Sequence, residues 1–219
     1  MSTAILGKKM GMMQVFDDKG NCVPVTLVEA GPCIVVQKRS PAKHKYSAIQ
    51  IGYEQVPGRK LSKPRMGVFE RLDLKPMRYL REIRLPQEEV DNYKIGDNIT
   101  VSIFAPGEKV DITGTSKGRG YQGVVRRYHM KGNTSTRGTH EHRRHPGSIG
   151  MREQPGRVIK GKKLPGQMGN KRVTTQNLTV YKVEEEKNLL YIDGPVPGAN
   201  GGLVMIKKAV KIYPPAKKQ

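Results

Sequence analysis

Short apolar runs separated by turn residues fill the first quarter of the chain. The runs are rich in Val, Ile, Met and Tyr and cover 12–16, 22–28, 33–38 and 46–53. Between them lie Asp17 to Asn21 and Ala30-Gly31-Pro32, and such residues tolerate the backbone angles of tight turns. This pattern predicts a β-meander or β-barrel with hairpins at both breaks.

Residues 56–75 have a helical pattern instead. Ser62 suits an N-cap and Pro64 a first helical turn, while Val68, Phe69 and Leu72 fall at helical spacing. We therefore predict a short helical insertion at about 56–76. We expect a helical turn at 87–93 and further strands at 79–85, 99–104, 110–113, 178–183, 189–193 and 203–206.

The composition changes sharply between Ile112 and Arg172. This stretch holds 15 Lys and Arg and the two acids Glu141 and Glu153, so it carries 15 − 2 = +13 of the formal charge of +21. It also holds 12 of the 25 glycines. Its apolar residues are few and do not recur at a regular spacing. Too few side chains can be buried to offset the entropy of ordering the backbone, so we expect an outside partner to order this segment.

Strand patterns flank the basic segment on both sides, so it is predicted to be an insertion in a β domain. We assign 1–113 and 173–213 to a discontinuous β domain, 114–172 to an extended arm and 214–219 to a basic tail. An arm that leaves and returns reaches at most roughly 100 Å when fully extended. The predicted fold class is mainly β, with a long basic, glycine-rich internal extension.

Such a positive charge indicates a polyanionic partner. A membrane surface is disfavoured, because the chain has no basic amphipathic helix and no apolar run of about 18 residues; we expect a soluble, cytoplasmic protein. Lys and Arg neutralise phosphates, glycine permits close approach, and the tyrosines and histidines offer stacking surfaces. RNA is favoured, and a DNA-compacting protein stays open as a rival. The predicted RNA-binding residues are Lys117, Arg119, Tyr121, Arg126, Arg127, Lys131, Arg137, His142, Arg143, Arg144, His145, Arg152, Arg157, Lys160, Lys162, Lys163, Lys171 and Arg172.

One motif favours an enzyme. Gly118 to Gly123 reads GRGYQG and matches the dinucleotide-binding pattern GxGxxG after a strand-like run. The residues after Gly123 allow at most two helical turns, and the expected second parallel strand with a terminal acid is missing. We therefore expect no nucleotide cofactor, no small-molecule substrate and no catalysis, with a nucleotide-dependent enzyme as the alternative.

His140, Glu141, His142 and His145 have side chains that suit zinc. Their HxHxxH spacing does not place two ligands at i and i+4, and no cysteine is near. We predict no metal site, and expect the histidines to contact phosphates or bases. Cys22 and Cys33, the only cysteines, are predicted to be buried, reduced thiols.

Four motifs in order resemble one family. They are ILGKKMGMMQVF (5–16), KGRGYQGVVRR (117–127), HRRHPGSIG (142–150) and GKKLPGQMGNKRVTTQNL (161–178). The chain resembles the bacterial large-subunit ribosomal proteins of the uL-three family along its whole length. The resemblance implies a translation-factor-like β-barrel, a structural role in the 50S subunit, and an arm that threads through 23S rRNA toward the peptidyl transferase centre.

The resemblance also implies a role in subunit assembly and neighbours from the L-fourteen and L-nineteen protein families. It places the functional tip on 145–155, with the residues Pro146, Gly147, Ser148, Ile149, Gly150, Met151, Arg152, Glu153, Gln154 and Pro155. Some relatives carry a methylated glutamine where this chain has Met151, and Gln154 is not the matching position. That modification is therefore not expected here.

Overall fold

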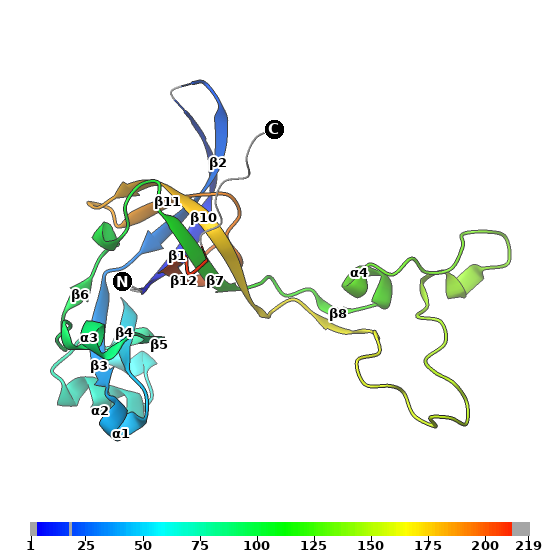
Figure 1. Ribbon diagram of the computed structural model, residues 1–219, viewed down its shortest axis with the longest axis horizontal. Coiled ribbons are helices and arrows are strands. Elements are labelled where there is room, and N and C mark those ends of the chain that lie inside the picture. Colours follow the sequence, from blue (N-terminus) through cyan, green and yellow to red (C-terminus); the bar gives the residue numbers. More distant parts are fainter. Residues whose placement is uncertain (1–3, 18, 212–219) are drawn as a thin grey trace. The chain divides into compact units, whose positions relative to one another are not determined.

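The computed structural model describes residues 4–17 and 19–211 (Figure 1). The described chain divides into two units, one of residues 4–17, 19–115 and 172–211 and one of Ser116–Lys171. We call the first the core unit and the second the arm. The prediction of a mainly β protein is confirmed. The predicted tail at 214–219 lies outside the described residues.

Six antiparallel strands of the core unit form a closed barrel. Their order around the ring is β1 (Ala4–Phe16), β12 (Leu203–Lys208), β7 (Lys109–Thr115), β10 (Arg172–Glu184), β11 (Leu189–Asp193) and β2 (Cys22–Ala30). Alternate residues such as Ile112, Leu190, Ile192 and Ile206 are fully buried, as the two-residue period of strands requires. β-Branched and leucine side chains at these positions fill the interior of the ring.

A second, four-stranded antiparallel sheet completes the core unit. The sequence pattern predicts its strands but does not indicate that they form a sheet apart from the barrel. Its order is β5 (Met77–Arg84), β4 (Ala48–Gln55), β3 (Cys33–Arg39) and β6 (Asn98–Ile99). Ile49, Ile51 and Ile83 from this sheet share one hydrophobic cluster with Ile5 and Ile112 of the barrel. The two sheets therefore fold around a common core.

Short helices connect the strands of the second sheet. They are α1 (Pro41–His44), η1 (Gly58–Lys60), α2 (Lys63–Arg71) and α3 (Gln87–Asp91). The helix predicted after Ser62 is confirmed, with Pro64 in its first turn. Phe69 is fully buried and packs with Val36 and Met77, so one aromatic side chain anchors α2. Val68 is 40% exposed and adds little to that anchor.

The strand predicted at 99–104 is wrong for most of its length. Only Asn98–Ile99 is extended, and Val101–Ile103 forms a 3₁₀ turn, η2. Val101 and Phe104 are both buried, and this three-residue spacing suits a 3₁₀ turn. Apolar alternation alone did not distinguish the two conformations.

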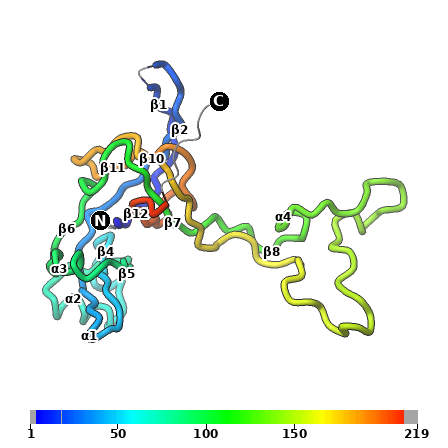
Figure 2. Tube along the Cα trace, in the orientation of Figure 1, coloured from blue at the N-terminus to red at the C-terminus, as the bar shows by residue number. Residues whose placement is uncertain are grey.

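The arm contains little regular structure, and its irregular course can be followed along the tube in Figure 2. It has one short antiparallel ribbon, β8 (Gly120–Gln122) with β9 (Gly166–Met168), one helical turn and a half in α4 (Val124–Tyr128), and a 3₁₀ turn η3 (His140–Arg144). Val124 is its one buried side chain. The arm thus lacks a hydrophobic core of its own. Among the described residues of the whole chain, no helix is long and apolar enough to cross a membrane.

Candidate nucleic-acid interface

Both ends of the arm are tied together by backbone hydrogen bonds. The Ser116 amide donates to the Lys171 carbonyl oxygen at 2.8 Å, and the Asn170 amide donates to the Ser116 carbonyl oxygen at 3.2 Å. Just before this point, Thr115 and Arg172 are directly opposite partners of β7 and β10. The arm therefore leaves and re-enters the core unit on two adjacent strands.

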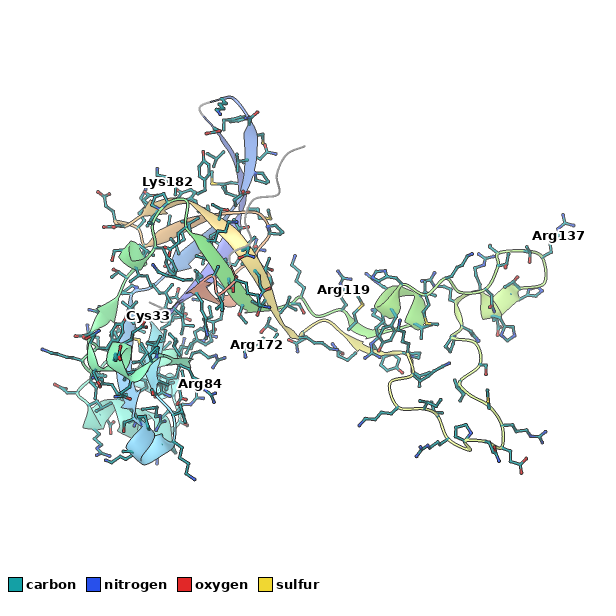
Figure 3. The ribbon with its side chains drawn as sticks, in the orientation of Figure 1. Cys33, Arg84, Arg119, Arg137, Arg172 and Lys182 are labelled. Carbon is teal, nitrogen blue, oxygen red and sulfur yellow. The ribbon has the colours of Figure 1, made fainter. Side chains whose placement is uncertain are left out.

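All cationic side chains of the arm except Arg127 face solvent. The segment 116–171 holds 14 Lys and Arg and two Glu, a formal charge of 14 − 2 = +12. No ion pair within the described part of the chain involves any of these side chains. Arg119 and Arg137 extend from the ribbon of the arm in Figure 3. A strong, unneutralised positive potential is the electrostatic footprint of a nucleic-acid site.

Of the residues predicted to bind RNA, all but Arg127 are exposed, including Tyr121 at 76%. Arg127 is partly buried, and its Nη1 donates to the Leu164 carbonyl oxygen at 2.7 Å. Its guanidinium also lies over the Tyr128 ring, 4.9 Å from the centroid. Arg127 therefore holds two stretches of the arm together and is the weakest candidate for a phosphate contact.

The segment 132–145 folds back on itself through polar contacts. The Asn133 amide donates to the Arg143 carbonyl oxygen at 3.0 Å, and the Asn133 side-chain amide donates to the His142 carbonyl oxygen at 3.0 Å. The His142 and His145 rings meet edge to face, with centroids 5.0 Å apart. These contacts display Arg143, Arg144 and both histidines on one short turn.

Residues 146–155, the predicted tip, have few contacts within the chain. Ser148 Oγ donates to the Gly150 carbonyl oxygen at 3.1 Å. Met151 is 80% and Ile149 50% exposed. Exposed apolar side chains beside Arg152 suit a surface that packs against bases as well as phosphates.

The glycine string 118–123 does not form a dinucleotide site. Gly120–Gln122 is strand β8, which pairs antiparallel with β9, and the helix after Gly123 has five residues. A dinucleotide site needs a parallel βαβ unit whose helix N-terminus faces the pyrophosphate. The nucleotide-dependent alternative therefore has no geometric support.

The histidine cluster at 140–145 does not form a metal site. No group of three or more His, Cys, Asp and Glu among the described residues is arranged to hold a metal ion. The backbone of His140 lies in the left-handed region, with a φ of 39°. This conformation forms the start of the η3 turn.

The cysteine prediction is half wrong. Cys33 is buried, but Cys22 is exposed. Cys22 begins β2 opposite Phe16, in the part of the hairpin that no third strand flanks in the described chain. Its apolar neighbours in sequence did not reveal that it lies beyond the barrel.

Sequence reasoning missed three contributors to the arm and its root. A Cβ on Gly166 would lie 2.6 Å from Arg127 Nη1, and a Cβ on Gly169 would clash with the Lys117 carbonyl oxygen. Lys207 is half-buried in β12, where burial lowers its pKa and the Arg172 charge lowers it further. The sequence shows that the arm is rich in glycine, but not which glycines have close neighbours. Lys207 lies in a barrel strand, and its position in sequence does not indicate that it is near Arg172.

The chain was compared with known proteins. The model of the family described as Ribosomal protein L3 matches residues 90–190. Large ribosomal subunit protein uL3 of Petrotoga mobilis is 53% identical over 215 residues, covering 98% of this chain and 99% of that protein. The uL3 proteins of Pelotomaculum thermopropionicum and Carboxydothermus hydrogenoformans are each 51% identical over 211 residues, covering 96% of this chain and 99% of theirs. These similarities extend over nearly the whole chain, so it belongs to the uL3 family of large ribosomal subunit proteins.

Proposed function

We propose that this structural constituent of the large subunit binds 23S rRNA through its arm and supports subunit assembly. The observation that carries the proposal is the arm's formal charge of +12 on a segment with one buried side chain: its cations form no ion pair within the described chain, and all but Arg127 are exposed. Its cations reduce the repulsion between phosphates, so rRNA helices that are distant in sequence can pack together. The partner in turn supplies the order that the arm lacks.

The root of the arm extends the proposed surface onto the core unit. Arg172 is exposed and lies close enough to Lys207 for their charges to interact. Two neighbouring cations repel each other, and a phosphate between them would relieve that repulsion. We therefore add Lys207 to the residues expected to contact RNA.

The family resemblance supports the finer parts of the proposal. The barrel is of the translation-factor type, the tip at 146–155 points toward the peptidyl transferase centre, and the neighbours come from the L-fourteen and L-nineteen families. In this role the chain is cytoplasmic and is not an enzyme, and any chemistry near the tip belongs to RNA.

Salt titration of binding tests the proposal. If six to ten phosphates are neutralised, affinity for 23S rRNA falls by about 10³–10⁵-fold between 50 and 200 mM salt. Changing Arg143, Arg144 and Lys163 together to Gln should reduce the slope by about 0.7–0.9 for each phosphate that is no longer neutralised. A nearly flat curve would reject the proposal. Equal competition by duplex DNA would favour the DNA-compacting rival.

A further inference from the structure

The β1–β2 hairpin continues past the barrel. β1 pairs with β12 only from Ala4 to Lys8, and β2 pairs with β11 only from Val25 to Glu29. Beyond an irregularity between Lys9 and Gly11, β1 pairs with β2 alone, while β2 still pairs with β11 as far as Val25. Only Gln14–Phe16 and Cys22–Pro24 therefore stand as a two-stranded ribbon. Figure 1 shows this ribbon extending from the barrel strands. We call residues 10–16 and 22–24 the distal hairpin.

The distal hairpin exposes large apolar side chains. Met10 is 51%, Met12 53%, Met13 43% and Phe16 69% exposed. Successive residues of a strand point to opposite faces, so Met12 and Met13 make both faces of the ribbon apolar. A two-stranded ribbon is marginal by itself in water, and contiguous exposed apolar surface usually marks an interaction site.

The charge of this region argues against RNA as the partner. Residues 10–24 contain Lys19, Asp17 and Asp18, a formal charge of 1 − 2 = −1, within a chain of +21. Affinity for RNA depends on cations that neutralise phosphates. The flexible, polarisable methionines instead suit an apolar protein surface.

The outer edge of β1 is open for backbone pairing. Gln14 lies opposite Pro24, which has no N–H. The Pro24 carbonyl oxygen accepts from the Gly194 amide at 3.0 Å, on the side away from β1, so Gln14 and Pro24 exchange no backbone hydrogen bond. Hydrogen-bonded and non-hydrogen-bonded pairs alternate along an antiparallel pair of strands. The backbone N–H and C=O groups of Met12, Gln14 and Phe16 therefore all point to the outer edge of β1. No described strand pairs with that edge beyond Lys8. An open edge with apolar side chains is a template for strand addition.

We propose that the distal hairpin docks an extended apolar segment of a neighbouring large-subunit protein, which adds as a strand beside Met12–Phe16. The inference rests on the chain's membership of the large subunit. It rests on the proposed function only because the arm and the distal hairpin would act in the same particle. It assigns the distal hairpin to protein and the arm to RNA.

The exposed thiol of Cys22 allows a direct test, because Cys33 is buried. A benzophenone maleimide on Cys22 of the full-length protein is incorporated into large subunits and irradiated. We expect a crosslink that resists ribonuclease and maps by mass spectrometry to an extended apolar segment of one ribosomal protein. Crosslinks to rRNA, to residues 212–219 of this chain, or to nothing would overturn the inference.

A matched arm label separates the two proposals. In a Cys22→Ser background, the same reagent on Arg137→Cys should crosslink to rRNA. Failure of the arm label alone contradicts the proposed function, whereas failure of the Cys22 label alone contradicts the docking surface.

A second measurement needs no label. Gln14→Pro removes an N–H that points to the open edge and leaves the β1–β2 ladder intact, whereas Gln14→Ala keeps the N–H and shortens the side chain. The docked protein should be about three- to tenfold depleted from Gln14→Pro subunits, the effect expected for one hydrogen bond. Equal protein composition in both variants would exclude strand addition.

Discussion

The Arg127 guanidinium donates a hydrogen bond to the carbonyl oxygen of Leu164, 37 positions further along the chain, at 2.7 Å. The same side chain lies over the Tyr128 ring, and Gly166 leaves room for it because it has no Cβ. Within the arm, this contact closes the long loop between α4 and β9. A hydrogen bond from a charged donor contributes about 1.5–3 kcal/mol, a large share of the stability of a segment with one buried residue.

We therefore expect Arg127→Ala to open this loop. Amides around Leu164 should exchange with solvent faster in the free protein, by roughly 10- to 100-fold, as followed by hydrogen exchange with mass spectrometry. Arg126→Ala is the matched control, since it removes the same charge from an exposed neighbour. Equal exchange in the two variants would show that the Leu164 contact does not hold the loop.

The root of the arm depends on Gly169. Its φ is +71°, and a Cβ there would overlap the Lys117 carbonyl oxygen. Gly169→Ala should disrupt the adjacent β8–β9 ribbon, which we expect to see as faster exchange of the Arg119 amide, the donor to Met168. Gly161→Ala is the control, because Gly161 has a φ of +88° with open space around it. This variant measures only the cost of placing alanine at a positive φ, about 1 kcal/mol. If both variants behave alike, the steric argument fails.

Burial raises the pKa of Cys33 to about 12, against a weaker lowering by a backbone hydrogen bond with Leu6. Iodoacetamide at pH 8 should therefore modify one thiol, that of the exposed Cys22, and reach Cys33 only after unfolding. Modification of two thiols in the native protein would contradict this burial.

The same shift makes stability depend on alkaline pH. Above its ordinary pKa of 9.0, the Cys33 thiol ionises in the unfolded state but keeps its proton in the folded state. The folded state then binds more protons, so stability falls as pH rises from about 9 to about 12. Urea unfolding of Cys33→Ala should lose less stability than the parent between pH 8 and 10. Parallel losses in the two proteins would assign the effect to other groups.

The arm of the free protein should exchange its amides far faster than the barrel. Its backbone hydrogen bonds are few and mostly solvent-exposed, while Ile112 and Leu190 mark a fully buried ring interior. Local opening of the arm then costs little compared with unfolding of the barrel. Hydrogen exchange on free and subunit-bound protein measures both states. Strong protection of 115–170 without RNA would show that the arm holds its shape unaided.

The sequence predicted most strands but not how they assemble. Ala4, Ile5 and Leu6 were missed at the start of β1 because all three are buried, so they show no alternation. Leu6 lies against Cys33 of the second sheet, and a strand covered on both faces reads as a continuous apolar run. Periodicity identifies a strand without naming its partners, so the second sheet could not be separated from the barrel.

The charge of the arm was predictable because it is a property of composition. The distinct role of Arg127 was not, because it depends on a backbone carbonyl far away in sequence. The same holds for the open edge of β1, which exists only because β12 stops at the level of Lys8. Such relationships depend on where neighbouring strands end.

Thr115 and Arg172, between which the arm is inserted, are directly opposite each other in an antiparallel pair. A tight turn of two residues could join β7 to β10 at that place without altering any barrel register. The arm can therefore lengthen, shorten or change its tip while the scaffold that carries it stays constant. This arrangement lets evolution change the contacts of the arm independently of the domain that supports it.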